Sequence, residues 1–321
     1  MSRRMRISAA VIAAILAAVA GCSGGRGPSG SPPEKTDIVV DVFPSIDTAG
    51  LYIAQMDGLF RAQGLNVTIK FAATSQSAVT GQEKGIYDIS SADYVTYVYN
   101  ELAGARLRII AEASFLQPGE LAMLAGTHSQ IKTVAGLAGK TISVAAPNDI
   151  ATLLVRSLLT QYGVSPGDVR FKAGVPLPDA GRVLHEGLAD AAPVPEPFVS
   201  ADEEQYGLGE LADLDQGATE DFPLQGFAVT QAWAQKYPGT LRAFVTALEQ
   251  GQQIADTDRS AVEKAVEKFL GIPARTAALI SLPGYPLSVD TVRLQRVPDA
   301  MVQYGLLPKK DASFKISSMT G

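Results

Sequence analysis

Short apolar runs alternate along most of the chain with segments whose apolar residues recur at helical spacing. Residues 38–43 are a β-branched run that ends before Pro44, which predicts a strand. Residues 48–63 carry apolar residues at helical spacing before Gly64, which predicts a helix with a glycine C-cap. The same criteria predict further strands over residues 67–71, 87–91, 107–111, 120–125, 141–145, 169–173 and 225–230. They predict further helices over residues 77–84, 94–102, 149–162, 179–187, 241–255, 260–270 and 289–306.

This alternation indicates the α/β class, built on parallel sheets with right-handed crossovers. It falls into two blocks, residues 36–122 and 127–224, which are followed by a mostly helical segment. The strand-like connections at 120–126 and 225–230 indicate that the chain passes twice between two lobes. We therefore expect lobe 1 to comprise residues 37–122 and 228–321, lobe 2 residues 127–224, and a hinge near 123–126 and 225–227.

The first residues have the pattern of an export signal. Arg3, Arg4 and Arg6 precede the uncharged stretch 7–21, which is shorter than the roughly 20 residues that span a bilayer. Small residues (Val-Ala-Gly) stand directly before Cys22, as in a bacterial lipobox. We expect a signal peptide over residues 1–21 and a lipid on Cys22. The alternative is a short anchor or buried helix with an accidental cysteine.

Residues 23–33 (SGGRGPSGSPP) are rich in Gly, Ser and Pro and are unsuited to a packed core. We expect residues 22–36 to be a flexible tether between the lipid and the folded part. The pair Arg3-Arg4 lacks the Phe-Leu of a twin-arginine signal, so the sequence leaves the export route open.

Composition excludes several classes of protein. Hydrophobic residues make up 46% and charged residues 19%, which excludes disorder of the whole chain. The net charge is −6 without a long basic run, so we expect no nucleic-acid partner. Cys22 is the only cysteine, and His128 and His185 are the only histidines, which leaves little material for a metal site or a His-based triad. We expect no metal, no cofactor and a monomeric chain.

A series of short motifs carries a resemblance to one family. They are AGLYIA (49–54), DGLF (57–60), GLNV (64–67), GIYDI (85–89), LAGKTI (137–142), PEP (195–197), LQRV (294–297), MVQYGL (301–306) and FKISSM (314–319). In this order they resemble the ABC-transporter solute-binding proteins that include sulfonate, nitrate and thiamine-pyrimidine binders. That family is often labelled by its likeness to yeast thiamine-precursor synthase. The resemblance spans nearly all of the chain after Cys22.

The resemblance implies a type II periplasmic-binding fold, in which two α/β lobes joined by a two-strand hinge close over a small molecule. It also implies that the closed form docks on an ABC permease and its ATPase. Together with the export signal, it leads us to expect a lipid-anchored receptor on the outer face of the bacterial cytoplasmic membrane, periplasmic or extracellular. A tether raises the concentration of such a receptor near its transporter.

Ligands of open α/β sheets bind beyond the carboxyl ends of the strands, and this rule selects candidate binding residues. Four of them, Asp47, Ser75, Asp93 and Asp149, also precede predicted helices, so simple N-capping is the alternative role for each. The full set of expected ligand-binding residues is Asp47, Thr48, Ser75, Gln76, Asp93, Tyr94, Phe115, Asn148, Asp149 and Glu196.

The candidate loops carry carboxylates and no Arg or Lys, which disfavours an anion even though helix N-termini attract anions. We expect a neutral or cationic nitrogen heterocycle, such as an aminopyrimidine thiamine precursor, with Tyr94, Phe115 or Phe222 stacking on its ring. The alternatives are a receptor for sulfonate- or nitrate-type anions, and carboxylates that pair with basic residues elsewhere.

We expect no catalysis. The thiamine-precursor synthases that share the fold use a histidine and a cysteine-rich cluster, and this chain lacks the cluster. A hydrolase that uses two of the carboxylates has no motif in its favour. A sensor without a transporter is a further alternative that the sequence does not separate from a transport receptor.

Overall fold

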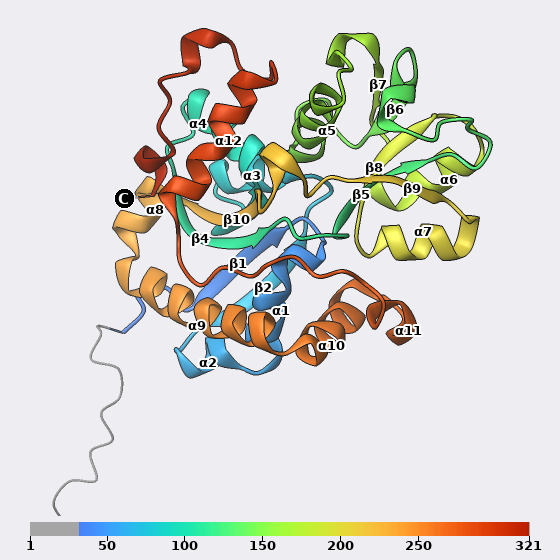
Figure 1. The fold of residues 1–321 in the computed structure, drawn as a ribbon. Coiled ribbons are helices and arrows are strands. Elements are labelled where there is room, and N and C mark those ends of the chain that lie inside the picture. Colours follow the sequence, from blue (N-terminus) through green and yellow to red (C-terminus); the bar gives the residue numbers. More distant parts are fainter. Residues whose placement is uncertain (1–31, 321) are drawn as a thin grey trace, which may run out of the picture. The chain divides into compact units, whose positions relative to one another are not determined.

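Two five-stranded sheets carry the fold in the computed structural model, which describes residues 32–320 (Figure 1). The first sheet contains β1 (Asp37–Val42), β2 (Asn66–Phe71), β3 (Ile89–Asp93), β4 (Leu107–Phe115) and β10 (Pro223–Thr230), in the order β2-β1-β3-β10-β4. The second contains β5 (Leu121–Ala125), β6 (Thr141–Val144), β7 (Arg170–Ala173), β8 (Ala191–Pro195) and β9 (Gly209–Asp213), in the order β7-β6-β8-β5-β9.

Both sheets are mixed, so the prediction of parallel sheets is wrong for part of each. Strand β1 pairs in parallel with β2 and β3, but β10 runs antiparallel to β3 and β4. In the second sheet β6 is parallel to β7 and β8, but β5 is antiparallel to β8 and β9. The antiparallel strands β5 and β10 are the two that enter their sheet directly from the other sheet, through short segments and without the helical crossover that joins parallel neighbours.

The strand directions place the carboxyl ends of most strands where the chain passes between the sheets. Because β10 is antiparallel to β3 and β4, its first residue Pro223 lies opposite Phe115, the last residue of β4. In the second sheet Leu121 at the start of β5 lies opposite Pro195 at the end of β8. The loops that follow β1, β3, β6 and β8 therefore lie at the edges that the crossing segments connect.

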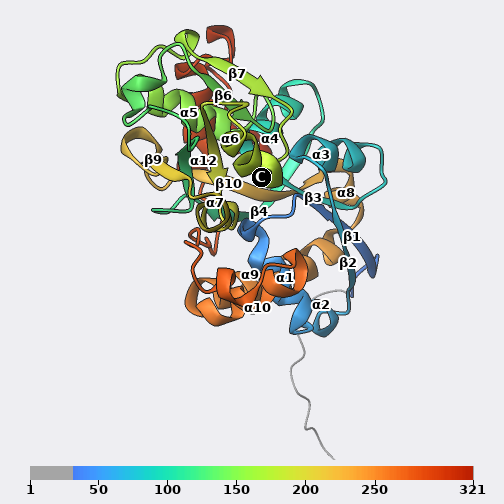
Figure 2. The same cartoon turned by 90° about the vertical axis from the view of Figure 1, so that its right-hand side faces the viewer.

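Helices cover both faces of the first sheet (Figures 1 and 2). The helices are α1 (Ala49–Met56), α2 (Leu59–Ala62), α3 (Ser75–Glu83), α4 (Tyr94–Leu102), α5 (Ile150–Gln161), α6 (Ala180–His185), α7 (Phe198–Tyr206), α8 (Gln231–Lys236), α9 (Pro238–Thr257), α10 (Arg259–Leu270), α11 (Ala274–Ala277) and α12 (Thr291–Gln303). Helices α1, α9 and α10 share one hydrophobic core with β1, whereas α4 and α12 pack into another core on the opposite face.

The alternation of side chains along β4 serves both cores. Ile110 joins the core of α1 and α9, and its neighbour Ile109 joins the core of α4 and α12. The second of these cores continues into the other sheet, because it also contains Ile142 of β6 and Leu153 of α5. The two sheets are thus joined by packed side chains as well as by the chain itself.

The crossing segments lie a few residues away from the hinge that the sequence indicates. Residues 123–126 fall largely within β5, and residues 225–227 lie inside β10, each of which belongs to a single sheet. The chain passes between the sheets at residues 116–120 and 214–222. The predicted helix over 48–63 is also interrupted, since Gly58 adopts a φ of 71° between α1 and α2.

The expected signal peptide and lipidated Cys22 lie outside the described residues, as does most of the expected tether. Its last residues contact the folded part. The Glu34 carboxylate accepts hydrogen bonds from the backbone amides of Gly239 and Thr240 at 2.9 Å each, and the amide of Lys35 donates to the Thr240 hydroxyl. Within residues 32–320, none of the helices combines the length and the apolar character needed to cross a membrane.

Candidate ligand-binding site

Asp93 and Asp149 begin one helix beside each sheet. Asp93 accepts from the Thr96 amide at 2.9 Å and from the Thr96 hydroxyl at 2.8 Å, so it caps α4. Asp149 accepts from the amides of Thr152 at 2.8 Å and Ala146 at 3.1 Å, so it caps α5. Both carboxylates therefore use oxygens on helix N-terminal amides that an anionic ligand would otherwise occupy.

The charge of Asp93 also acts on the pKa of Asp149. Burial raises the pKa of Asp93, against the hydrogen bonds from Thr96 and Ser75. Burial and the nearby charge of Asp93 raise the pKa of Asp149 to about 6. Asp93 ends β3 of the first sheet and Asp149 lies in the loop after β6 of the second, so a carboxylate of one sheet acts on a carboxylate of the other.

Asp47 is buried but does not cap a helix. Its carboxylate accepts from the Ser114 hydroxyl at 2.6 Å and from the Gln225 side-chain amide at 2.9 Å. Burial raises the pKa of Asp47, against hydrogen bonds from the Ser114 and Ser45 side chains. The capping alternative for this residue is therefore wrong, and Asp47 instead lies against β4 and β10.

Glu196 follows β8 and joins the second sheet to the C-terminal part of the chain. It accepts from the Ser200 hydroxyl at 2.7 Å, the Ser200 amide at 3.1 Å and the Ser281 amide at 3.1 Å. Burial raises its pKa. Ser281 precedes Gly284, which forms an antiparallel bridge to Phe115 of the first sheet, so Glu196 contacts a segment that packs on the other sheet.

Glu120 is a buried carboxylate that the sequence rules do not select. It is 1% exposed, and its Oε2 has no hydrogen-bond partner among the described residues. Burial raises the pKa of Glu120 well above its ordinary value, and the charges of Asp47, Glu196 and Asp213 raise it further. The rule that ligands bind beyond the carboxyl ends of strands does not select Glu120. This residue precedes β5, an antiparallel strand whose amino end lies at the same edge of the sheet as the carboxyl end of β8.

Within residues 32–320, these five carboxylates (Asp47, Asp93, Glu120, Asp149 and Glu196) make no ion pair with Lys or Arg. Their hydrogen-bond donors are hydroxyls, amides and one glutamine side chain. The alternative that basic residues neutralise the acidic loops is thus wrong for the described part of the chain. A set of buried or half-buried carboxylates without cationic partners favours hydrogen-bond donors and cations as ligands.

The remaining expected polar residues divide between buried and exposed positions. Thr48 is buried and donates to the Ser45 carbonyl at 3.3 Å. Ser75 accepts from the Asp93 amide at 3.2 Å, which places it beside that carboxylate. Gln76 is exposed and pairs with Asn100, and Asn148 is exposed.

The three aromatic candidates are engaged in packing. Tyr94 is fully buried in the core of α4 and α12, and its hydroxyl faces Gly226 without a hydrogen-bond partner among residues 32–320. Phe115 lies under the guanidinium of Arg293, and Phe222 under that of Arg296, each at 5.1 Å from guanidinium carbon to ring centre. Tyr94 is thus closed off by the core, and an arginine covers one face of each phenylalanine ring.

Two small pockets lie away from the carboxylates. One of about 240 Å³ is lined by Arg108, Gln231, Gln235 and Ser318 at the other end of β4. One of about 120 Å³ lies between α9, β4 and residues 286–289. Neither is lined by an expected ligand-binding residue, and both are smaller than the usual 300–1,000 Å³ of a site for a drug-sized ligand. No group of three His, Cys, Asp or Glu residues that could hold a metal ion occurs within residues 32–320.

Comparison with known proteins identifies the family. The NMT1/THI5-like family matches residues 45–258, which is more than half of the sequence. The chain belongs to the NMT1/THI5-like family. The family resemblance carried by the sequence motifs is thereby confirmed, and the match covers segments of both sheets.

Similar proteins support the fold. A protein of Escherichia coli (strain K12) named for binding aliphatic sulfonates is 24% identical over 233 residues, which cover 70% of this chain and 71% of the relative. The alkanesulfonate-binding protein SsuA from Xanthomonas axonopodis pv. citri has a TM-score of 0.71 at 21% identity, covering 86% and 96% of the two chains. The nitrate-binding protein NrtA from Synechocystis PCC 6803 has a TM-score of 0.74 at 16% identity, covering 87% and 84%. The predicted periplasmic-binding-protein fold is confirmed.

Proposed function

We propose that this protein is the solute-binding component of an ABC importer, which captures one small molecule between two lobes and delivers it to a permease and its ATPase. The main support is that α4 and α5, the helices capped by Asp93 and Asp149, lie beside different sheets and contact each other. The lobes would comprise residues 37–115 with 223–320, and residues 121–213. The hinge would be the crossing segments 116–120 and 214–222.

The ligand we favour is a neutral or cationic nitrogen compound with several N–H donors, such as an aminopyrimidine. The carboxylates of Asp93 and Asp149 already occupy the N-terminal amides of α4 and α5. Buried Glu120 offers an oxygen without a partner among residues 32–320. A cationic ligand or one with several N–H groups relieves the repulsion among these carboxylates, whereas an anionic ligand adds to it.

The second candidate is a receptor for sulfonate- or nitrate-type anions. It is favoured by the relatives named for sulfonates and nitrate. An anion would need a donor set other than the amides that the two aspartates cap. Movement of these carboxylates away from α4 and α5 would free those amides.

We also propose that a lipid on Cys22 anchors the protein to the outer face of the bacterial cytoplasmic membrane. The short uncharged stretch 7–21 before Cys22 supports this proposal. Glu34 and Lys35 fix the start of the folded part to α9, so the chain enters the folded part beside Gly239. Labelling of cells with a fatty-acid analogue, with Cys22→Ser as the control, tests this point.

Thermal unfolding of the purified protein against a panel of solutes tests the proposed function. The panel holds aminopyrimidines, thiamine, riboflavin, polyamines, taurine, alkanesulfonates and nitrate. A ligand at 100 times its dissociation constant stabilises by about 2.7 kcal/mol, which is a readable shift of the unfolding midpoint. We expect an aminopyrimidine or a cation to give this shift.

Asp93→Asn and Glu196→Gln should abolish the shift, because each removes one charge and keeps an acceptor oxygen for the local hydrogen bonds. The matched control is Asp168→Asn, at an exposed position, and it should leave the shift unchanged. Stabilisation by nitrate or sulfonates alone would instead support the anion receptor. No stabilisation by any solute would contradict both candidates.

A further inference from the structure

Two arginines of α12 contact the second segment through which the chain passes between the sheets and the residue directly before the first. Arg293 lies over Phe115, which directly precedes the first crossing segment. Arg296 lies over Phe222, which ends the second. Because the arginines are three positions apart on one helix, they lie on neighbouring parts of the same helix face. One turn of α12 therefore contacts the second crossing segment and the strand end from which the first one starts.

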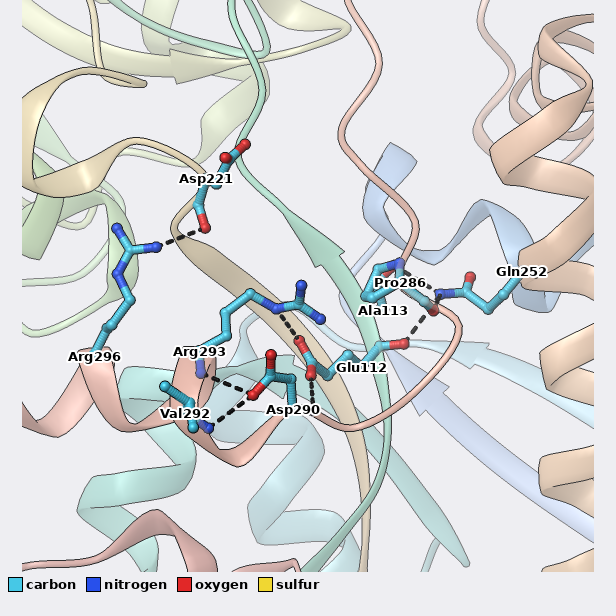
Figure 3. Close-up of polar contacts among 9 residues, drawn as sticks. All are labelled: Glu112, Ala113, Asp221, Gln252, Pro286, Asp290, Val292, Arg293 and Arg296. Atoms are coloured by element: carbon cyan, nitrogen blue, oxygen red, sulfur yellow. Dashed lines mark hydrogen bonds and ion pairs between the residues drawn. The ribbon is translucent and has the colours of Figure 1, made fainter.

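Arg296 holds the backbone of the second crossing segment. Its guanidinium donates to the carbonyl oxygens of Asp221 at 3.0 Å, Ala218 at 3.1 Å and Glu220 at 2.6 Å (Figure 3 shows the bond to Asp221). A guanidinium has its N–H donors in a rigid, planar arrangement, so three carbonyls of one turn reach it together only in a defined backbone conformation.

The turn that Arg296 holds is not one that its residues adopt readily. Asp221 has a φ of 50°, in the left-handed region that residues other than glycine seldom occupy. Its amide donates to the Asp215 carboxylate at 2.8 Å. Contacts from outside the turn are thus needed to maintain it, and Arg296 supplies three of them.

Arg293 ties the same helix to β4. Its Nε donates to Glu112 at 3.0 Å, and the Glu112 side chain is completely buried. The Asp290 amide, just before α12, donates to the other oxygen of Glu112 at 2.6 Å (Figure 3). The start of α12 is therefore attached to the first sheet close to Phe115.

The two crossing segments are also bonded to each other. The Leu116 amide donates to the Phe222 carbonyl at 2.8 Å, and the Gln117 side chain donates to Asp221 at 2.6 Å. A change of backbone torsion in one segment must therefore move the other. A helix that holds one of them restrains both.

We propose that Arg293 and Arg296 are positioning residues that hold the crossing segments in one conformation and so set the resting arrangement of the two lobes. The inference rests on the proposed function only in treating these segments as a hinge. Hinge closure requires large torsion changes at a few residues. The three carbonyl contacts of Arg296 are lost when residues 218–221 change conformation, so Arg296 favours the conformation described here.

The test measures the distance between the lobes in the absence of any solute. Cys22→Ser removes the only cysteine of the full chain, and Lys84→Cys with Gln205→Cys then places one exposed spin-label site beside each sheet. Pulsed electron–electron double resonance gives the distribution of distances between the labels. The variants are Arg296→Gln, Arg296→Lys and Arg293→Lys. Arg170→Gln is the control, because Arg170 contacts only the Thr141 hydroxyl within the second sheet.

We expect Arg296→Gln to shift or broaden the distribution by about 2 Å or more. Arg296→Lys should have an intermediate effect, since an ammonium lacks the planar fork. Hydrogen exchange of the Leu116 amide should become faster in the same variants, while amides of β6 keep their rates. An unchanged distribution in folded Arg296→Gln and Arg293→Lys proteins would overturn the inference.

The outcome is separate from that of the solute panel. A shifted distance distribution in a protein that no solute stabilises would keep the role of the arginines and leave the proposed function without support. An unchanged distribution in a protein that binds an aminopyrimidine would support the proposed function and overturn the role of the arginines. If Arg296→Gln does not fold, Arg296→Lys decides the question alone.

Discussion

Asp93 caps helix α4 beside the first sheet, Asp149 caps α5 beside the second, and the charge of Asp93 raises the pKa of Asp149. Two sites far apart in the sequence thus form one electrostatic unit. The unit joins the last residue of β3 in the first sheet to the loop after β6 in the second. Its titration should therefore be visible in the stability of the whole protein.

The first prediction concerns pH. Because the pKa of Asp149 is raised from its ordinary 3.8 to about 6, the folded protein binds more protons than the unfolded chain over this range. The stability contributed by protonated Asp149 is present below about pH 3.8 and is lost as the pH rises through about 6. Asp149→Asn does not titrate. Its free energy of unfolding relative to the natural protein should rise by about 1–2 kcal/mol between about pH 4 and pH 7.5.

Chemical denaturation at the two pH values measures this difference. Asn retains an acceptor for the Thr152 amide but loses the one for Ala146, so the variant starts at a disadvantage at low pH. Asp168→Asn, at an exposed position of the same part of the chain, serves as the control. A difference between variant and natural protein that stays constant with pH would contradict the prediction.

A second prediction concerns Glu120, whose buried carboxylate meets the charges of Asp47 and Glu196. Because the pKa of Glu120 is raised, its protonated form contributes stability to the folded protein. This stability is fully present below pH 4.5, the ordinary pKa, and is lost as the pH rises through the raised pKa. Glu120→Gln should therefore be more stable than the natural protein by about 1 kcal/mol or more at alkaline pH. Thermal unfolding between about pH 5 and pH 9 should show this gain growing with pH.

The exposed Glu83 provides the control for Glu120, as Glu83→Gln should change stability little at any pH. Binding of a cationic ligand gives a second measurement on Glu120→Gln. Glu120→Gln should weaken the binding of a cation while stabilising the empty protein. Weaker binding of a cation together with lower stability would indicate a structural role for the carboxylate.

The α/β alternation could be predicted from the sequence because most elements carry their own signal. The capped helix α4 after Asp93 and the β-branched run of β1 are examples, since their patterns are local. The candidate carboxylates Asp93, Asp149 and Glu196 could be predicted from the same local patterns, because each lies at or after the end of a predicted strand. The structure places Asp93, Asp149 and Glu196 at the edges of the sheets that the crossings connect.

The antiparallel strands could not be predicted in this way. Strand direction depends on which strand the chain pairs with after it passes between the sheets, and no local pattern encodes that choice. Glu120 was missed for this reason, since it precedes β5 instead of following a parallel strand. The aromatic candidates failed for another reason. Tyr94 is an aromatic residue directly after a strand, a position from which a ring can stack on a ligand. Only its packing against Gly226 shows that its ring lies in the core.

The third prediction tests that packing. A Cβ at Gly226 would lie 2.5 Å from the Tyr94 hydroxyl and 2.8 Å from its ring carbon Cζ, which is closer than van der Waals contact allows. Gly226→Ala should therefore lower the free energy of unfolding by roughly 1–3 kcal/mol. Tyr94→Phe should be neutral or stabilising, because the hydroxyl has no partner among residues 32–320.

A double-mutant cycle by chemical denaturation decides whether the two effects are coupled. Tyr94→Phe should recover part of the stability lost in Gly226→Ala, with a coupling of at least about 0.5 kcal/mol. Gly209→Ala is the control, since no atom lies within 4 Å of a Cβ at that position. Additive effects of the two substitutions would show that the Tyr94 hydroxyl is not the group that the added methyl group displaces.

The fourth prediction compares two ion pairs of different burial. Glu112 is completely buried and pairs with Arg293, which is 23% exposed, whereas Arg182 and Glu186 are 46% and 43% exposed. Removing one partner of a buried pair leaves an uncompensated charge. Glu112→Gln should therefore lower the free energy of unfolding by about 2–3 kcal/mol, and Glu186→Gln by less than about 0.5 kcal/mol.

The loss in Glu112→Gln should persist in about 1 M salt, because the pair lies where ions do not screen it, while any loss in Glu186→Gln should vanish. Equal and salt-sensitive losses in both variants would mean that solvent reaches Glu112, and that α12 is not anchored to β4 through this carboxylate.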